Sequence, residues 1–115
     1  MVPSGTSALI TALVACGVQA GDEVIVPNYT MVATGNAVRL VGAVPVFVDV
    51  CAETFTVDLP TIQSAITPKT RAVLHVTLNN RSRNLSEIAE WCREKSVWLI
   101  EDAAQSLGCF HQGVH

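Results

Sequence analysis

The sequence predicts an α/β protein in which helices alternate with the strands of a mainly parallel sheet. Two observations favour this fold class. Short β-branched runs alternate with segments whose apolar residues recur at helical spacing. In addition, half of the 115 residues are hydrophobic, only 15% are charged, and the mean hydropathy is +0.39. A small domain has much surface, so this apolar content indicates strands that are buried on both faces.

The first half of the chain predicts two helices and two strands. Apolar residues at helical spacing predict a helix over residues 7–16, which ends at a glycine. The β-branched run 23–27 predicts a strand that ends at a proline. Thr30 is expected to cap a second helix that reaches about residue 41. The apolar residues 44–50 then predict the second strand.

The second half repeats this alternation. Asp58 is expected to cap a short helix over residues 59–66, which Thr-Pro ends. Residues 71–78 predict the third strand. Asn84, with a glutamate three residues later, resembles a capping box for a helix that reaches about residue 95. Residues 97–101 predict the fourth strand, so polar residues that follow each strand should gather at one edge of the sheet.

Charge and composition exclude several classes of protein. The net charge is −3 and the sequence has no basic patch or aromatic ladder, so nucleic acid is not an expected partner. No apolar run approaches the roughly 18 residues of a membrane span, and no charged start of a signal peptide is present. The four scattered cysteines lack a C-x-x-C pair, which favours reduced thiols in a cytoplasmic protein. Cys109, His111 and His115 give only a faint hint of zinc, so no metal site is predicted.

The segment 4–9 is a candidate anion site. Gly5 permits close approach to the backbone, and Thr6 and Ser7 fall in the first turn of the predicted helix. The free N–H groups of a first turn, together with the helix dipole, favour a phosphate. An ordinary serine or threonine cap is the alternative interpretation of the same residues.

Asp102 is a candidate functional carboxylate because it follows the apolar strand residues 98–100. Ala103 and Ala104 are too small to shield it, so a partner can approach closely. A buried carboxylate needs a positive partner or several donors, and a protonated pyridine nitrogen would suit it. Capping of the next turn is an alternative. A magnesium ligand is a third possibility, although Glu101 should point to the opposite side of the strand.

Several motifs occur in the order of one family. They are Ser4–Leu9, Gly21–Pro27, Tyr29–Thr34, Gly42–Val50, Ala65–Thr70 and Ile100–Gln105. Across essentially its whole length the chain resembles the sugar aminotransferases of the DegT/DnrJ/EryC1/StrS group. The resemblance implies a fold-type I enzyme that uses pyridoxal phosphate, with a three-layer α/β/α large domain of which residues 1–115 are a part.

The resemblance also implies roles for individual residues. Thr6 and Ser7 match residues whose amides and hydroxyls hold the cofactor phosphate. Asp102 matches the acid that keeps the pyridine nitrogen protonated, which strengthens the ring as an electron sink. Gln105 matches the residue that binds the 3-hydroxyl of the ring. Met31 stands where many members place an aromatic side chain over the ring, and a thioether can also pack on an aromatic face.

The sequence departs from the family pattern in two places. Relatives often carry a Val-His-Leu-Tyr-Gly-like run at the third strand, where this chain has residues 76–80. His75 precedes that run and is interpreted as a strand histidine with a structural partner. The Schiff-base lysine of the family falls after Asp102, beyond this sequence, whereas Lys69 and Lys95 are interpreted as solvated surface residues. No catalytic residue is therefore assigned within these 115 residues.

The resemblance implies a function for a longer protein. That function is amino transfer from an amino-acid donor to a nucleotide-linked keto-sugar, in a homodimer. The family's N-terminal segment, lysine segment and C-terminal small domain would lie outside residues 1–115. Two alternatives remain open. The family also contains pyridoxal-phosphate-dependent sugar dehydratases in which histidine replaces the lysine, and the chain could be a truncated or non-catalytic product.

Overall fold

The predicted alternation of helices and strands is confirmed by the computed structural model, which describes residues 1–81, 84–110 and 113. Its elements are α1 (Gly5–Ala15), β1 (Glu23–Pro27), α2 (Val32–Leu40), β2 (Val44–Val48), α3 (Leu59–Ala65), β3 (Thr70–Val76), the 3-10 helix η1 (Leu78–Asn80), α4 (Leu85–Glu94) and β4 (Trp98–Asp102). The observed ends differ from the predicted ones by a residue or two, as element ends commonly do.

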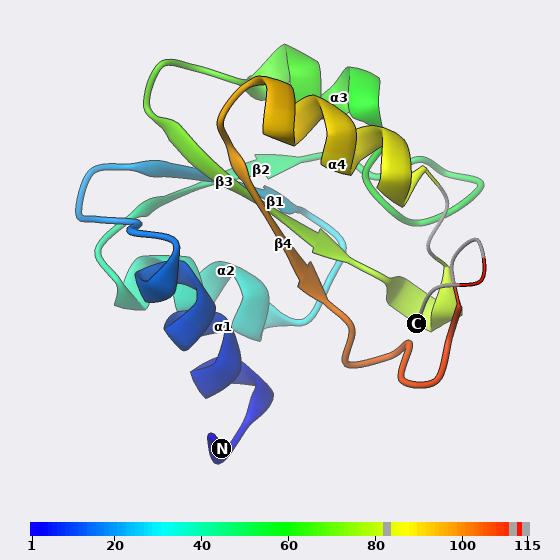
Figure 1. The fold of residues 1–115 in the computed structure, drawn as a ribbon, viewed down its shortest axis with the longest axis horizontal. Helices are drawn as coiled ribbons and strands as arrows, with labels where there is room; N and C mark the ends of the chain where they lie inside the picture. The colour runs from blue at the N-terminus through cyan, green and yellow to red at the C-terminus, as the bar shows by residue number, and fades with distance from the viewer. Residues whose placement is uncertain (82–83, 111–112, 114–115) are drawn as a thin grey trace.

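The strands form one parallel sheet in the order β2-β1-β3-β4. Helices α1 and α2 cover one face of this sheet, and α3 and α4 cover the other (Figure 1). The protein therefore has the three-layer α/β/α architecture that was predicted. Parallel strands need crossover connections, and the three helices α2, α3 and α4 supply them.

Alternate residues along β1 and β3 point to opposite faces of the sheet and pack in two separate hydrophobic cores. In β1, Val24 and Val26 pack with α1 and α2, whereas Ile25 packs with α3 and α4; all three side chains are fully buried. In β3, Leu74 and Val73 divide in the same way. Each fully buried aliphatic side chain contributes about 1.5–3 kcal/mol. Burial on both faces explains the unusually apolar composition.

The helix caps agree only in part with the sequence. Asp58 caps α3 as predicted, since its Oδ1 accepts a hydrogen bond from the Thr61 amide at 3.0 Å. The prediction for Thr30 is wrong: the N-cap residue of α2 is Met31, and the Thr30 hydroxyl lies 3.1 Å from that of Thr34.

The capping box at Asn84 is also wrong, because its side chain makes no cap hydrogen bond. The Asn84 backbone is left-handed, with φ at 63°, whereas side-chain caps occur with an extended backbone at the N-cap. Asparagine tolerates the left-handed region better than most residues. Asn84 therefore serves the turn into α4 through its backbone conformation.

The carboxyl edge, where the parallel strands end, collects the loops after β1, β2, β3 and β4. Helix α1 runs opposite to the strands, so its N-terminus lies on the side where β4 ends (Figure 1). The strand order reverses between β1 and β3, since β1 leads through α2 to one side and β3 leads through α4 to the other. In open α/β sheets, ligands bind outside such a switch point.

Apolar side chains are exposed at both edge strands of the sheet. In β2, Val44 and Phe47 are 49% and 59% exposed, and in β4, Trp98 is 57% exposed. No helix in the described part of the chain is long and apolar enough to cross a membrane. The exposed Val44, Phe47 and Trp98 side chains mark parts of the two edge strands that the described residues leave uncovered.

We predict that residues 1–115 expressed alone are poorly soluble. Two strands present unpaired edges flanked by exposed apolar side chains, and such edges pair readily with other chains. Size-exclusion chromatography with light scattering should find aggregates, and a Trp98→Lys variant should form fewer of them. A soluble wild-type monomer with a cooperative thermal transition would contradict this prediction.

Candidate functional site

The predicted site residues come from separate parts of the chain, and the topology brings their elements to the carboxyl edge. Thr6 and Ser7 lie in the first turn of α1, and Met31 lies at the N-terminus of α2. Asp102 ends β4, and Gln105 follows it in the next turn. Residues that lie up to about a hundred positions apart in the sequence therefore meet at one edge of the sheet, because these helices start there and the strands end there.

The N-terminus of α1 is capped by Ser4. Its hydroxyl oxygen accepts a hydrogen bond from the Ser7 amide at 3.2 Å, and the two serine hydroxyls lie 3.0 Å apart. The first helical backbone bond runs from the Ala8 amide to the Ser4 carbonyl at 3.0 Å. The amides of Gly5 and Thr6 precede that bond, so they are the first-turn donors available to an anion. The serine cap and the anion site are therefore compatible, with Thr6 better placed than Ser7 to supply an amide.

Asp102 is half-buried at the end of β4, rather than deep in the interior. By the alternation of a strand it shares the sheet face of Ile100, which α1 covers. Its Oδ1 accepts a hydrogen bond from the Ala104 amide at 3.1 Å, so the turn-cap interpretation describes one of its oxygens. A carboxylate accepts through both oxygens, which leaves capacity for a positive partner.

The acids at the end of β4 do not form a pair. Glu101 lies on the opposite sheet face from Asp102, as expected, and its carboxylate accepts from the Thr77 hydroxyl at 3.1 Å. Among the described residues no group of three or more histidine, cysteine or acidic side chains could hold a metal ion. His111 and His115, which were considered with Cys109, lie outside the described residues.

Gln105 joins the loop after β4 to the turn after β3. Its Oε1 accepts from the Asn79 amide at 3.0 Å, which orients the side chain and leaves the Nε2 group as a donor. Met31 is 64% exposed at the start of α2. An exposed thioether at this edge has a free surface on which a planar ring can pack.

A partly buried polar cluster that the sequence analysis missed holds the end of β4. The Thr77 hydroxyl lies 3.1 Å from the Asp102 carbonyl oxygen and 2.7 Å from the Ser106 hydroxyl, in addition to its contact with Glu101. The Thr77 amide also donates to the Asp102 carbonyl at 3.2 Å. We call Thr77, Glu101, Asp102 and Ser106 the Thr77 cluster. A threonine directly after β3, whose central residues 72–74 are apolar, was the available signal.

His75 departs from its predicted role. The side chain is fully buried in β3, and neither ring nitrogen has a hydrogen-bond partner among the described residues, so the expected structural partner is absent there. The strand register places it opposite Glu101, but the Glu101 carboxylate is bonded to Thr77. Burial lowers the pKa of His75 from 6.5 to about 4, and the imidazole is therefore neutral near pH 7.

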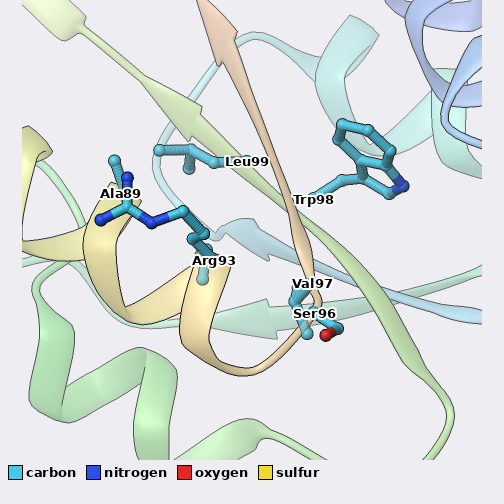
Figure 2. Close-up of a pocket in the computed structure, with 7 residues that line it drawn as sticks. Ala89, Arg93, Ser96, Val97, Trp98 and Leu99 are labelled. Atoms are coloured by element: carbon cyan, nitrogen blue, oxygen red, sulfur yellow. The ribbon is translucent and has the colours of Figure 1, made fainter.

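Both described lysines lie at the opposite, amino edge of the sheet. Lys69 immediately precedes β3, and Lys95 is the C-cap residue of α4. An apolar cavity of about 360 Å³ also opens there, beside the start of β4 (Figure 2). Figure 2 shows Arg93 and Leu99 on one side of β4 and Trp98 on the other. Neither lysine nor this cavity is near the end of the strand that carries Asp102.

The residues at the carboxyl edge fit the chemistry of pyridoxal phosphate. Free first-turn amides suit its phosphate, a carboxylate on the α1 side suits a protonated pyridine nitrogen, and the Gln105 amide suits a ring oxygen. Neither Lys69 nor Lys95 lies at this edge.

The comparisons with known proteins identify the family. The family model described as the DegT/DnrJ/EryC1/StrS aminotransferase family matches residues 1–115, and the chain belongs to this family. It is 42% identical over 110 residues to GDP-perosamine synthase of Caulobacter vibrioides, covering 96% of this chain and 30% of that protein. It is 43% identical over 111 residues to L-glutamine:2-deoxy-scyllo-inosose aminotransferase of Streptomyces lividus, covering 96% of this chain and 26% of that protein.

Solved structures agree with the sequence relatives. DesV of S. venezuelae superimposes with a TM-score of 0.94 at 38% identity, covering 97% of this chain and 30% of that one. NtdA of Bacillus subtilis, solved with bound cofactor PMP, gives a TM-score of 0.90 at 39% identity, with coverages of 96% and 25%. The chain spans between about a fifth and a third of the length of these relatives.

We predict that Thr77→Val destabilises a folded protein containing this segment by about 0.5–1.5 kcal/mol, because it removes the hydrogen bonds of a fully buried hydroxyl, while the Asp102 carbonyl keeps the Thr77 amide and Ser106 keeps the Ala103 carbonyl. Valine keeps the shape of threonine, so the change isolates the hydroxyl. Urea unfolding measures the loss, and Thr77→Ser, which keeps the hydroxyl, should lose less. A loss in Thr77→Ser with no loss in Thr77→Val would show that the methyl packing, rather than the hydrogen bonds, matters.

The buried His75 predicts an acid-sensitive fold. Its pKa is about 4 in the folded state and about 6.5 when unfolded, so folding favours the neutral imidazole. The contribution is complete above about pH 6.5 and falls as the pH decreases toward 4, by roughly 3 kcal/mol in total. Urea unfolding at a series of pH values measures this slope, which His75→Leu should reduce. An unchanged slope in the variant would assign the acid sensitivity to other groups.

Proposed function

We propose that residues 1–115 form part of the large, cofactor-binding domain of a pyridoxal-phosphate-dependent aminotransferase. The observation that carries this proposal is the convergence of Asp102, Gln105 and the free amides of α1 at one edge of the sheet. Two relatives that match 96% of this chain are named as aminotransferases, and their greater length supports a complete enzyme that contains further segments.

Each residue has a proposed task. The Thr6 amide and hydroxyl bind the cofactor phosphate, with Ser7 supporting this turn through its contacts with Ser4. Asp102 holds a proton on the pyridine nitrogen by electrostatic attraction, and Gln105 donates to the 3-oxygen of the ring. Met31 packs on the ring face. When bound, the cofactor supplies an electron sink for amino transfer.

The proposed substrates are a nucleotide-linked keto-sugar and an amino-acid amino donor. Two relatives are named GDP-perosamine synthase and UDP-2-acetamido-2-deoxy-3-oxo-D-glucuronate aminotransferase, which supports a nucleotide-linked substrate. We also propose that the full-length protein is a homodimer in the cytoplasm. The apolar side chains exposed on the two edge strands support this, because further segments of the protein or a second subunit would cover them.

A sugar dehydratase is the second candidate function. A solved GDP-4-keto-6-deoxymannose-3-dehydratase superimposes with a TM-score of 0.89 at 28% identity over 99% of this chain. The family position at which lysine or histidine would separate the two reactions falls outside residues 1–115, so both reactions use the same proposed cofactor contacts. Incubation with an amino donor and the keto-sugar distinguishes them, because only the aminotransferase forms an amino-sugar. A chain without either activity would support the non-catalytic alternative.

We predict that Asp102→Asn in the full-length protein lowers turnover by about tenfold to a hundredfold. The change removes a charge-assisted hydrogen bond worth about 1.5–3 kcal/mol, while the amide oxygen can still accept from Ala104. Single-turnover rates and the absorbance of bound pyridoxal phosphate measure the effect.

Glu101→Gln is the matched control, because Glu101 neighbours Asp102 on the opposite sheet face. It should retain close to the wild-type rate, with any effect confined to stability through the Thr77 cluster. Wild-type single-turnover rates in Asp102→Asn would reject the assignment of this carboxylate to the pyridine nitrogen.

A further inference from the structure

Arg81 is set apart from the other described cations by its place in the fold. It directly follows η1, at the carboxyl end of β3. The remaining described lysines and arginines lie at strand starts or helix ends, and both features fall at the amino edge of the sheet. These residues are Arg39, Lys69, Arg71, Arg93 and Lys95. Within residues 1–81, 84–110 and 113, Arg81 is therefore the only lysine or arginine at the edge where the candidate cofactor site lies.

The Arg81 guanidinium is held in place by two contacts and has no acidic partner among the described residues. Its central carbon lies 5.3 Å from the centroid of the Phe55 ring, and Nη1 donates to the Thr54 carbonyl at 3.3 Å. The ion pairs found among the described residues are Arg71–Asp22 and Arg93–Glu90, and neither involves Arg81. A guanidinium has five N–H donors in a planar fork that matches phosphate oxygens, and one carbonyl contact leaves most of them available.

An exposed aromatic pair adjoins this cation. The rings of Tyr29 and Phe55 lie 5.7 Å apart at an interplanar angle of 43°, with Tyr29 56% and Phe55 40% exposed. Phe55 has a left-handed backbone, with φ at 57°, which is unfavourable for a bulky residue and is found preferentially at ligand sites. The surrounding loop keeps this conformation through the Phe55 amide, which donates to the Cys51 carbonyl at 2.7 Å.

The topology places these residues beside the candidate cofactor site. Tyr29 follows β1 and Arg81 follows β3, so they flank the switch point where α/β sheets bind ligands. Asn79, two residues before Arg81, donates its amide to Gln105. Asn79 and Asn80 both have left-handed backbones, and this sharp turn sets where Arg81 leaves the strand.

We propose that Arg81, Tyr29 and Phe55 bind the nucleoside diphosphate part of the substrate. Arg81 contacts the diphosphate, and the exposed face of Tyr29 stacks on the nucleobase. This inference rests on the proposed aminotransferase function and assigns residues to the nucleotide part of its proposed substrate. Relatives divide on this point, because the names of some contain a GDP or UDP sugar while others are named for 2-deoxy-scyllo-inosose, a ketone without a nucleotide.

The test measures the binding of UDP, GDP and inorganic pyrophosphate to the full-length holoprotein by titration calorimetry. Arg81→Met should weaken all three ligands by about tenfold or more, because charge-assisted contacts to phosphate are lost. Tyr29→Leu should weaken UDP and GDP but leave pyrophosphate unchanged. Arg39→Met, which removes an exposed cation at the opposite edge, is the matched control and should bind all three ligands like the wild type.

Arg81→Gln is the second variant if Arg81→Met does not fold, because glutamine can still donate to the Thr54 carbonyl but carries no charge. Nucleotide affinities within about twofold of wild type in the folded Arg81 variant would overturn the inference. It would also be overturned if the wild-type holoprotein aminates a phosphate-free ketone and binds neither UDP nor GDP. A full-length protein without the absorbance of bound pyridoxal phosphate would instead reject the proposed function.

Discussion

The geometry of the candidate site depends on the hydroxyl of Thr77. This group meets the carboxylate of Glu101, the carbonyl of Asp102 and the hydroxyl of Ser106 in a buried position at the end of the sheet. It therefore links the exit of β3 to the last residues of β4 and to the turn that follows. The hydroxyl has one proton to donate and can also accept, and the low-dielectric interior strengthens its buried contact with Ser106. The contacts of Thr77 with Asp102 and Ser106 stabilise the turn that carries Gln105.

Parallel pairing separates two kinds of chemistry between the two edges of the sheet. Every strand ends at one edge, and α1 begins there, so free amides, Asp102 and Gln105 meet at that edge. The helix ends and strand starts meet at the other edge, together with Lys69, Lys95 and the cavity of Figure 2. A favourable helix dipole at the first edge adds to the attraction for anions. The positive charge of Arg81, which lies in the loop after η1, also favours anions at this edge.

The alternation of side chains along β3 and β4 gives neighbouring residues different environments. Asp102 faces the side of α1, whereas Glu101 faces the opposite side and is used by Thr77. The same alternation leaves His75 fully buried without a hydrogen-bond partner among the described residues. An unpaired neutral imidazole reduces stability, and burial strongly resists its protonation. The end of β3, close to the candidate site, thus contains a buried imidazole, that of His75, which lowers the stability of the fold.

The sequence by itself determined the order of elements, the parallel sheet and the Asp58 cap, because these depend on local patterns. It also determined the family and the three-layer architecture that the family implies, because several motifs occur in a fixed order. Tertiary structure decided the roles of Thr30, Asn84 and His75, since their partners and backbone angles follow from packing. It also explains Gly35 inside α2, where an added Cβ would lie 3.0 Å from the Phe47 ring. The Thr77 and Arg81 contacts join residues 24 or more positions apart, and only the folded sheet brings those residues together.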